Sequence, residues 1–207
     1  EALELLQTFV VTGSSQFPRA LPLVLRALPV AQSAAWLKGL AQYPDRQRDL
    51  IAGVGAVGDP FYVPWLIKQM QAPVSARLAG EAFSFITGAD IGFGQLEAER
   101  PQAVAAAPTE AAEDDRVALD PDEDLPWPDP ARVEAWWAAR QHQFHQGTRY
   151  FLGAPVCEAQ CRKALKEGFQ RQRTAAALEL ALLLPDERLF ETRAPGWRQR
   201  RQLVDRV

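Results

Sequence analysis

The chain has 207 residues, of which 47% are hydrophobic and 24% charged, and its formal net charge is −3. This composition is ordinary for a soluble globular protein and excludes a chain that is disordered throughout. No stretch approaches the ~18 apolar residues of a membrane span, no signal peptide is visible, and two cysteines are too few for a disulfide framework, so we expect a cytoplasmic protein.

A helix-pair pattern occurs twice, with an offset of 42 residues. Residues 20–25 align with residues 62–67, so that Pro22 corresponds to Pro64, and residues 32–37 align with residues 74–79 at the same offset. A period near 40 residues built from helix pairs is typical of HEAT and armadillo repeats. The pattern therefore predicts an all-α fold, a HEAT-like helical-repeat solenoid. Its equivalent antiparallel helix pairs would be residues 19–42 and 61–86.

Helix signals follow one another through residues 1–88, which we expect to form the domain of HEAT-like repeats. The expected helices span residues 3–11, 19–28, 31–42, 45–57, 60–70 and 75–86. Pro22 would lie in the first turn of its helix, where a missing N–H costs no hydrogen bond. Asp45 and Asp59 are expected N-caps, and Gly88 is an expected C-cap. Arg77 is interpreted as a scaffold residue.

Residues 89–130 break the helical pattern with five prolines before Pro130 and most of the acidic charge. Loops of this length are usually functional or disordered, so we expect a long acidic Pro-rich loop. Residues 131–207 then return to helix, with expected helices over residues 131–146, 156–167, 169–184 and a short one in the tail. We expect this C-terminal part, with its helical hairpin around Gly168, to pack on the repeats. Residues 149–152 are ambiguous between helix and strand.

Charge is distributed unevenly along the chain. Residues 1–96 contain seven acidic and seven basic side chains, residues 97–129 eleven acidic and two basic, and residues 131–207 eight acidic and fourteen basic. One interpretation is that the acidic segment folds back on the basic part of the chain. The other is that a charged patch meets a charged partner, because local potential steers association more than net charge does.

Metal sites and common catalytic motifs find little support. The pairs His142/His145 and Cys157/Cys161 supply four zinc-binding side chains, but neither pair lies on an evident turn, so we expect no metal there. The acidic run 120–124 lacks the glycine and glutamate that define an EF-hand. No phosphate loop, nucleophile elbow or His–Glu metal helix occurs. We therefore expect a protein that is not an enzyme and needs no cofactor; an enzyme with a metal in the acidic loop is the least favoured interpretation.

The acidic loop supplies the expected partner-binding residues. Trp127 stands between two prolines and is therefore pre-ordered. It either pins the loop onto its own helices or offers an interfacial anchor. The expected partner-binding residues are Asp114, Asp115, Asp120, Asp122, Glu123, Asp124 and Trp127.

Short motifs between residues 45 and 195 combine into a recognisable pattern. They are residues 55–60, 63–66, 79–83, 86–88, 120–130, 136–137, 147–153 and 171–184, with the acidic Pro-Trp-Pro segment the most distinctive. With these motifs the chain resembles an uncharacterised bacterial family of HEAT-like proteins encoded beside type VI secretion genes. The resemblance implies a type VI setting, as an immunity protein or as an accessory to effector loading, and it implies no catalytic residues.

We therefore expect a cytoplasmic immunity protein that binds and neutralises a type VI secretion toxin by occlusion. A nuclease toxin is the natural target, since its substrate groove is positive and carboxylates can stand in for phosphates. The alternative is an adaptor that helps to load a type VI effector. In both cases the partner is a protein, and for the immunity protein it is a basic toxin domain. We expect no direct binding to nucleic acid or to a membrane.

Overall fold

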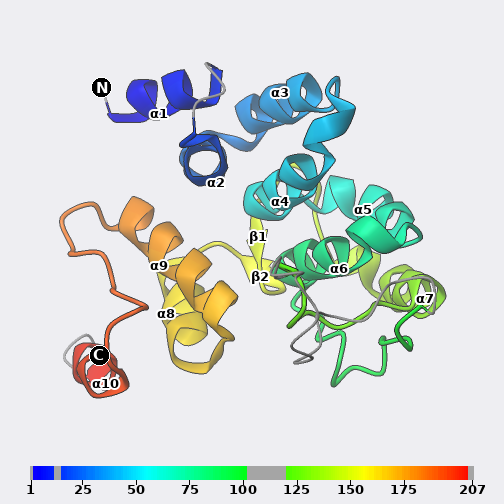
Figure 1. The fold of residues 1–207 in the computed structure, drawn as a ribbon. Coiled ribbons are helices and arrows are strands. Elements are labelled where there is room, and N and C mark those ends of the chain that lie inside the picture. Colours follow the sequence, from blue (N-terminus) through cyan, green and yellow to red (C-terminus); the bar gives the residue numbers. More distant parts are fainter. Residues whose placement is uncertain (1, 12–14, 102–119, 205–207) are drawn as a thin grey trace, which may run out of the picture.

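The computed structural model describes residues 2–11, 15–101 and 120–204, and this part of the chain is mainly helical (Figure 1). The α-helices are α1 (Ala2–Val11), α2 (Phe17–Ala27), α3 (Val30–Leu40), α4 (Gln47–Val57), α5 (Val63–Gln69), α6 (Pro73–Thr87), α7 (Pro130–Arg140), α8 (Glu158–Glu167), α9 (Gln170–Leu183) and α10 (Gly196–Val204). The short 3-10 helices are η1 (Pro44–Arg46), η2 (Pro60–Tyr62) and η3 (Gln141–Gln143). None of the described helices is long and apolar enough to cross a membrane.

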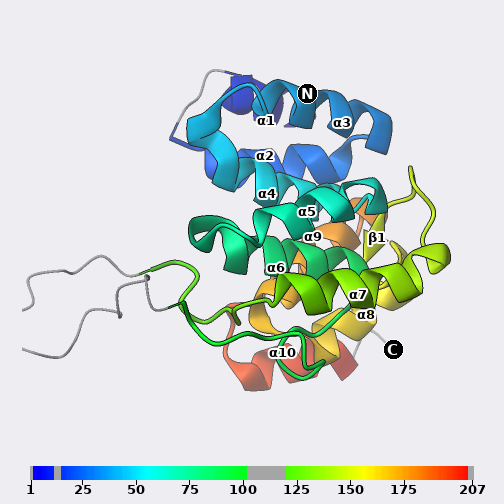
Figure 2. The same ribbon diagram turned by 90° about the vertical axis from the view of Figure 1, so that its right-hand side faces the viewer.

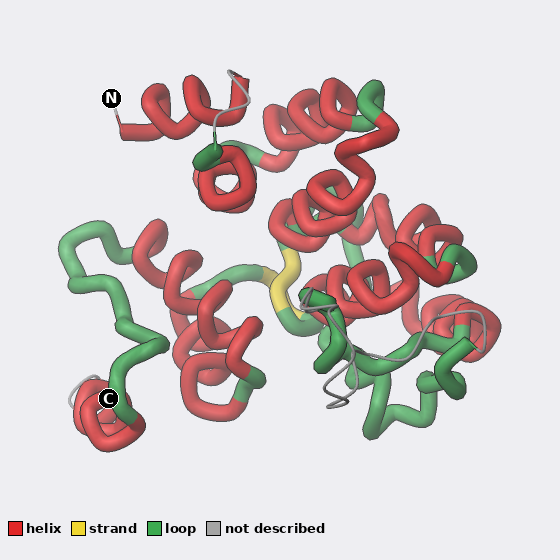
Figure 3. Tube along the Cα trace, viewed as in Figure 1, coloured by secondary structure: helices red, strands yellow, loops and turns green. Residues whose placement is uncertain are grey.

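A single antiparallel strand pair interrupts the described helices, so the all-α prediction is confirmed in its main feature. β1 (Tyr150–Phe151) pairs with β2 (Ala154–Pro155), and Figure 3 shows the pair between the helical parts. β1 falls within residues 149–152, where the sequence is ambiguous between helix and strand.

Helices α1 to α7 pack in two neighbouring rows. α2, α4 and α6 pack on one another in this order, while α1, α3 and α5 each pack on the helix that follows them in the chain. α7 then packs on α5. In Figure 2 α2, α4, α6 and α7 follow one another from top to bottom. The α8–α9 hairpin lies beside these rows, and α9 contacts α2 (Figure 1).

This packing differs from the predicted register of the repeat. α2 packs most extensively on α1 and α4 and less on α3, whereas the 42-residue offset matches it with η2 and α5, which lie in the other row. Pro22 lies inside α2, whose first turn holds Pro18, while Pro64 does lie in the first turn of α5. The equivalence of Pro22 and Pro64 stays a prediction, because η2 directly precedes α5 and the two helix pairs can be aligned from Pro60 onward. Asp45 likewise lies within η1 and does not cap α4.

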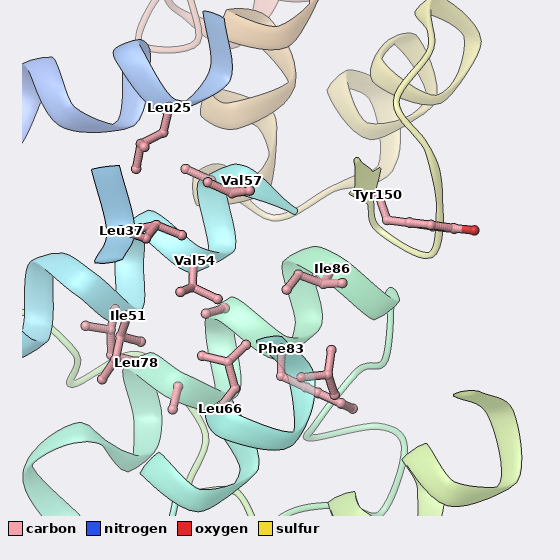
Figure 4. Close-up of a cluster of buried hydrophobic side chains, with 14 of the residues drawn as sticks. Leu25, Leu37, Ile51, Val54, Val57, Leu66, Leu78, Phe83, Ile86 and Tyr150 are labelled. Carbon is pink, nitrogen blue, oxygen red and sulfur yellow. The ribbon is translucent and has the colours of Figure 1, made fainter. Parts of the chain in front are cut away.

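The apolar core falls into two clusters that meet at β1. The larger cluster joins α1 to α7 and ends at Tyr150, and Figure 4 shows its centre, where Val54 of α4 lies between Leu25 of α2 and Phe83 of α6. The smaller cluster begins at Phe151 and joins α8 to α9. The apolar clusters thus divide the chain inside β1, and α7 packs on α5 of the larger cluster. The predicted boundary at residue 131 stays a prediction.

A strap formed by residues 147–153 crosses the C-terminal ends of α4 and α6. Its backbone N–H groups donate to carbonyls at these ends, from Tyr150 to Gly58 at 2.8 Å, Leu152 to Phe85 at 2.6 Å and Gly153 to Ile86 at 3.1 Å. A Cβ on Gly58 would lie 2.3 Å from the Tyr150 carbonyl oxygen, and one on Gly88 would lie 2.7 Å from the Leu152 oxygen. Both glycines have φ of +71°. The strap therefore requires glycine at these two helix ends.

We expect Gly58→Ala to lower the free energy of unfolding by more than about 2 kcal/mol, because the new Cβ meets backbone and the backbone conformation is left-handed. Gly39→Ala in α3 is the matched control, since its Cβ would meet nothing within 4 Å. It should raise the free energy of unfolding by about 0.5–1 kcal/mol. Urea unfolding measures both changes, and equal behaviour of the two variants would contradict the role of the strap.

Arg149 fastens the strap to α2. Its guanidinium donates to the carbonyl oxygens of Arg26 at 2.6 Å and of Leu25 and Leu28 at 2.8 Å each. The carbonyls of a last helical turn lack intrahelical partners and form the negative end of the helix dipole, so a cation is favourable there.

Glu179 of α9 joins the same buried cluster. Its Oε1 atom lies 3.1 Å from Arg26 Nε and 4.0 Å from Arg149 Nη1. Burial raises the pKa of Glu179 above its ordinary value, and the two arginines oppose this rise. Since the cost of burying these charges offsets much of their attraction, we expect the hydrogen bonds of Arg149 to stabilise the fold more than the ion pairs do.

Candidate partner-binding site

The carboxylates of residues 120–124 in the acidic loop lie against arginines of the chain's own helices. Asp122 is only 4% exposed, and its two oxygens accept hydrogen bonds from Arg48 of α4 at 2.7 and 3.0 Å. Such a two-point pair neutralises the charge of Asp122 and also holds this part of the loop in one position against α4. Asp114 and Asp115, which we also expect to bind a partner, lie outside the described residues.

Arg77 of α6 gathers three further groups of the loop. It forms ion pairs with Asp120 and with Glu123, the latter at 3.6 Å. The carbon centre of its guanidinium also lies 4.6 Å from the centre of the Trp127 ring. A cation over an indole face is attracted by the ring, so Arg77 holds both the charge and the aromatic side chain of the loop. This is the scaffold role expected for a basic residue in this helix.

The backbone around Trp127 is also fixed. The carbonyl oxygen of Trp127 accepts a hydrogen bond from Ala98 N at 2.7 Å, and Asp129 N donates to the Leu96 carbonyl oxygen at 2.7 Å. Pro128 packs directly on α6, where a Cβ on Gly80 would lie 3.3 Å from the proline ring. Trp127 is half-buried as a result. This position corresponds to the alternative in which Trp127 pins the loop onto the chain's own helices, as opposed to the alternative in which it anchors a partner.

Arg171 of α9 connects the acidic loop to the C-terminal hairpin. Its Nη2 atom donates to Asp124 Oδ1 at 2.7 Å and to the Pro121 carbonyl oxygen at 2.6 Å, and its Nη1 atom lies 3.2 Å from Glu81 Oε2. Burial raises the pKa of Glu81, and Arg171 opposes the rise. One arginine thus joins α6, α9 and the loop.

The acidic loop therefore folds back on the protein, as the first interpretation of the charge pattern expects. Arg48 and Arg77 precede the loop in the chain and pair with Asp122 and Asp120. The basic C-terminal part supplies Arg171, which pairs with Asp124, and Arg132, which pairs with Asp129. Asp122, one of the expected partner-binding residues, is buried and has Arg48 as its internal partner. Whether the loop also touches a partner stays a prediction.

The pairing of Asp120 predicts a measurable pH dependence. Its pKa is held below its ordinary value, first by the hydrogen bond from Asp122 N at 2.9 Å and then by Arg77. A carboxyl whose pKa falls on folding contributes stability above its unfolded-state pKa and loses it as the pH falls through the folded-state pKa. Between about pH 5 and pH 2 the wild type should therefore lose more stability than Asp120→Asn. Urea unfolding of both proteins across this pH range measures the difference. Parallel plots of unfolding free energy against pH would contradict the prediction.

A cavity of about 900 Å³ opens between the acidic loop, the loop after α6 and the α8–α9 hairpin. Residues of α6, of segments 88–97 and 123–126, of α8 and of the start of α9 line it. We call it the acidic cavity because six of its lining residues are acidic and two are basic, namely Glu81, Asp90, Glu97, Glu123, Asp124 and Glu167 against Lys163 and Arg171. Segments far apart in the sequence therefore produce one negative concave surface.

Three of these carboxylates are not neutralised by an arginine. Asp90, Glu97 and Glu167 form no ion pair with any residue in the described part of the chain, and neither does Lys163. Glu97 and Glu167 are exposed. The acidic cavity therefore keeps an excess of negative charge after its internal pairs are formed.

Two exposed phenylalanines are part of the same lining. Phe93 is 88% exposed and Phe169 is 62% exposed. Each ring follows a local turn. In the first turn, Phe93 N donates to Asp90 Oδ1 at 3.0 Å, and a Cβ on the neighbouring Gly94 would lie 2.3 Å from the backbone carbonyl oxygen of Asp90. Gly168 likewise leads into α9 and places Phe169 in solvent. The turns thus present both rings outward.

The sequence contains a signal for these phenylalanines that our expectations did not use. Phe93 stands between two glycines, and Phe169 directly follows Gly168. An aromatic residue in a turn has no apolar neighbour at helical spacing to pack on, so it is a candidate for exposure. No comparable signal joins Glu97 to Glu167, because their proximity depends on how the hairpin packs.

The described lining of the acidic cavity consists mainly of carboxylate, amide and apolar side chains. It includes the Ser84 hydroxyl but no histidine or cysteine side chain. In the described residues no group of three or more histidine, cysteine or carboxylate side chains is placed to hold a metal ion. Burial raises the pKa of Cys161 to about 12, so this thiol is not a nucleophile.

No family model, curated protein or solved structure matches the chain.

Proposed function

We propose that the protein is a HEAT-like helical-repeat scaffold that binds a basic type VI secretion toxin domain and neutralises it by occlusion, without catalysis. The observation that carries this proposal is the acidic cavity, with its unpaired carboxylates and the exposed Phe93 and Phe169. Exposed aromatic side chains at a charged concave surface are typical of protein interfaces. The resemblance to the type VI-associated family supplies the setting, and the two rows of helices support the repeat architecture.

The acidic cavity is a better candidate for the contact than residues 120–124 of the acidic loop. The described loop carboxylates Asp120, Asp122 and Asp124 each pair with an arginine, so a basic partner would have to displace an internal cation to reach them. Glu97 and Glu167 need no such displacement. Binding across the cavity would cover a positive substrate groove of the toxin with a rigid, negatively charged body.

The test takes candidate toxin domains from the open reading frames that flank this gene and measures protection of a bacterial host that expresses them. The wild-type protein should restore growth and form a stable complex with the toxin. Glu97→Lys combined with Glu167→Lys should lose protection, whereas Glu134→Lys, an exposed change outside the cavity, should keep it. Folded, expressed wild-type protein that gives no protection would reject the proposal.

An effector-loading adaptor is the second candidate, and a separate surface favours it. An adaptor needs two partners, and α10 presents a basic face unlike the acidic cavity, with Trp197 63% exposed beside Arg198, Arg200 and Arg201. Secretion assays with the α10 arginines changed to glutamine distinguish the two functions. If the protein is an adaptor, the variant with glutamine in α10 should lose effector delivery. If it is an immunity protein, the same variant should still protect its host.

A further inference from the structure

We infer that the acidic cavity binds one extended segment of the partner chain, in which lysine or arginine alternates with aromatic or aliphatic side chains. This inference rests on the proposed function, since it names the part of the partner that is recognised. Such a segment would place its cations against Glu97, Glu167 and Asp90 and its apolar side chains against Phe93 and Phe169.

Charge complementarity is the first argument for this occupant. The acidic cavity carries three carboxylates without an internal cation and one lysine, Lys163, without an internal anion. An acidic or neutral segment would leave the three carboxylates desolvated and unpaired, which costs free energy. A basic segment supplies the missing partners and is steered toward the cavity by its potential.

The exposed rings supply the second argument. Pockets for small molecules enclose most of their ligand, and aromatic side chains that line them are covered. Phe93 and Phe169 are instead largely in solvent, so the ligand that buries them must extend beyond the cavity. A polyamine or a metal ion has no apolar surface to cover two rings, whereas a peptide segment offers charge and apolar side chains at alternating positions.

Size is the third argument. The cavity volume of about 900 Å³ is near the upper end of the range of small-molecule sites. It is lined by α6, segments 88–97 and 123–126, Leu152, α8 and the start of α9, and these segments offer contacts to several side chains at once. One extended strand of partner chain therefore fits this shape better than a single side chain.

The experiment uses the full-length protein and an array of random-sequence peptides. Bound sequences should be enriched in lysine or arginine next to phenylalanine, tryptophan or leucine. Fluorescence anisotropy of the best-bound peptide then measures Kd. Phe93→Ala with Phe169→Ala should raise Kd at least about tenfold, and Glu97→Gln with Glu167→Gln should raise it about tenfold at low salt and weaken its salt dependence. Phe61→Ala and Glu134→Gln, both exposed and outside the cavity, are matched controls that should leave Kd unchanged.

Three outcomes would overturn the inference. They are no basic enrichment on the array, displacement of the peptide by spermidine at equal concentration, and unchanged Kd in both cavity variants. Growth protection separates this inference from the proposed function. Full protection by the cavity variants keeps the proposed function and rejects the inference, whereas peptide binding without any protection rejects the proposed function alone.

Discussion

Arg149→Met should lower the free energy of unfolding by about 3–5 kcal/mol, a larger effect than any other single substitution considered above. The side chain of Arg149 is 13% exposed, and its guanidinium donates to three carbonyl oxygens in and after the last turn of α2. Methionine keeps the apolar stem but leaves these buried acceptors with fewer donors. Urea unfolding followed by circular dichroism measures the loss, because the helical signal reports the whole fold.

Two further variants separate the geometry of Arg149 from its charge. Arg149→Lys keeps the charge but cannot reach three carbonyls with a rigid fork, so it should recover only a minor part of the loss. Arg132→Met is the matched control, since Arg132 also donates to two carbonyl oxygens, at 3.3 Å, but its side chain is 58% exposed. It should lower stability by less than about 1 kcal/mol. If Arg149→Lys is as stable as the wild type, the positive charge and not the three hydrogen bonds accounts for the stability, and the prediction is wrong.

Helix ends were predictable where one residue and its chain neighbours determine them. Asp129 accepts hydrogen bonds from the first N–H groups of α7, Asp59 accepts one at the start of η2, and Gly88 ends α6 with a left-handed backbone. These features depend on local geometry, which the sequence carries directly. Pro22 shows the limit: a proline after a short apolar run looks like a helix start, but α2 begins earlier and tolerates it inside.

Contacts between distant segments could not be predicted in the same way. Arg149 reaches α2 across more than 120 residues of chain, and Asp122 reaches Arg48 across 74. Charge counts left open whether the acidic loop meets basic side chains of its own chain or of a partner, and they did not indicate which arginines it would meet. The acidic cavity depends still more on packing, because its walls are assembled only when the α8–α9 hairpin lies beside α6.

Neutralising Asp120, Asp122 and Asp124 together to asparagine should lower the free energy of unfolding by about 2–4 kcal/mol. Asp122 accounts for most of this loss, because it is buried and paired at two points with Arg48, whereas Asp124 is more exposed and contributes little. Partner affinity should stay within about twofold at temperatures where the variant is folded. Thermal unfolding and binding to the toxin domain are measured on the same preparations.

The cavity carboxylates should behave in the opposite way. Glu97→Lys with Glu167→Lys should leave the melting temperature nearly unchanged, because both side chains are exposed and form no ion pair in the described part of the chain. Toxin affinity should fall about a hundredfold, since like charges then face each other across the interface. If the asparagine variant instead keeps its stability and loses affinity, the loop is the contact surface and its arginine pairs open on binding. The carboxylates of both sets are acidic, and their burial and their internal partners distinguish the two sets.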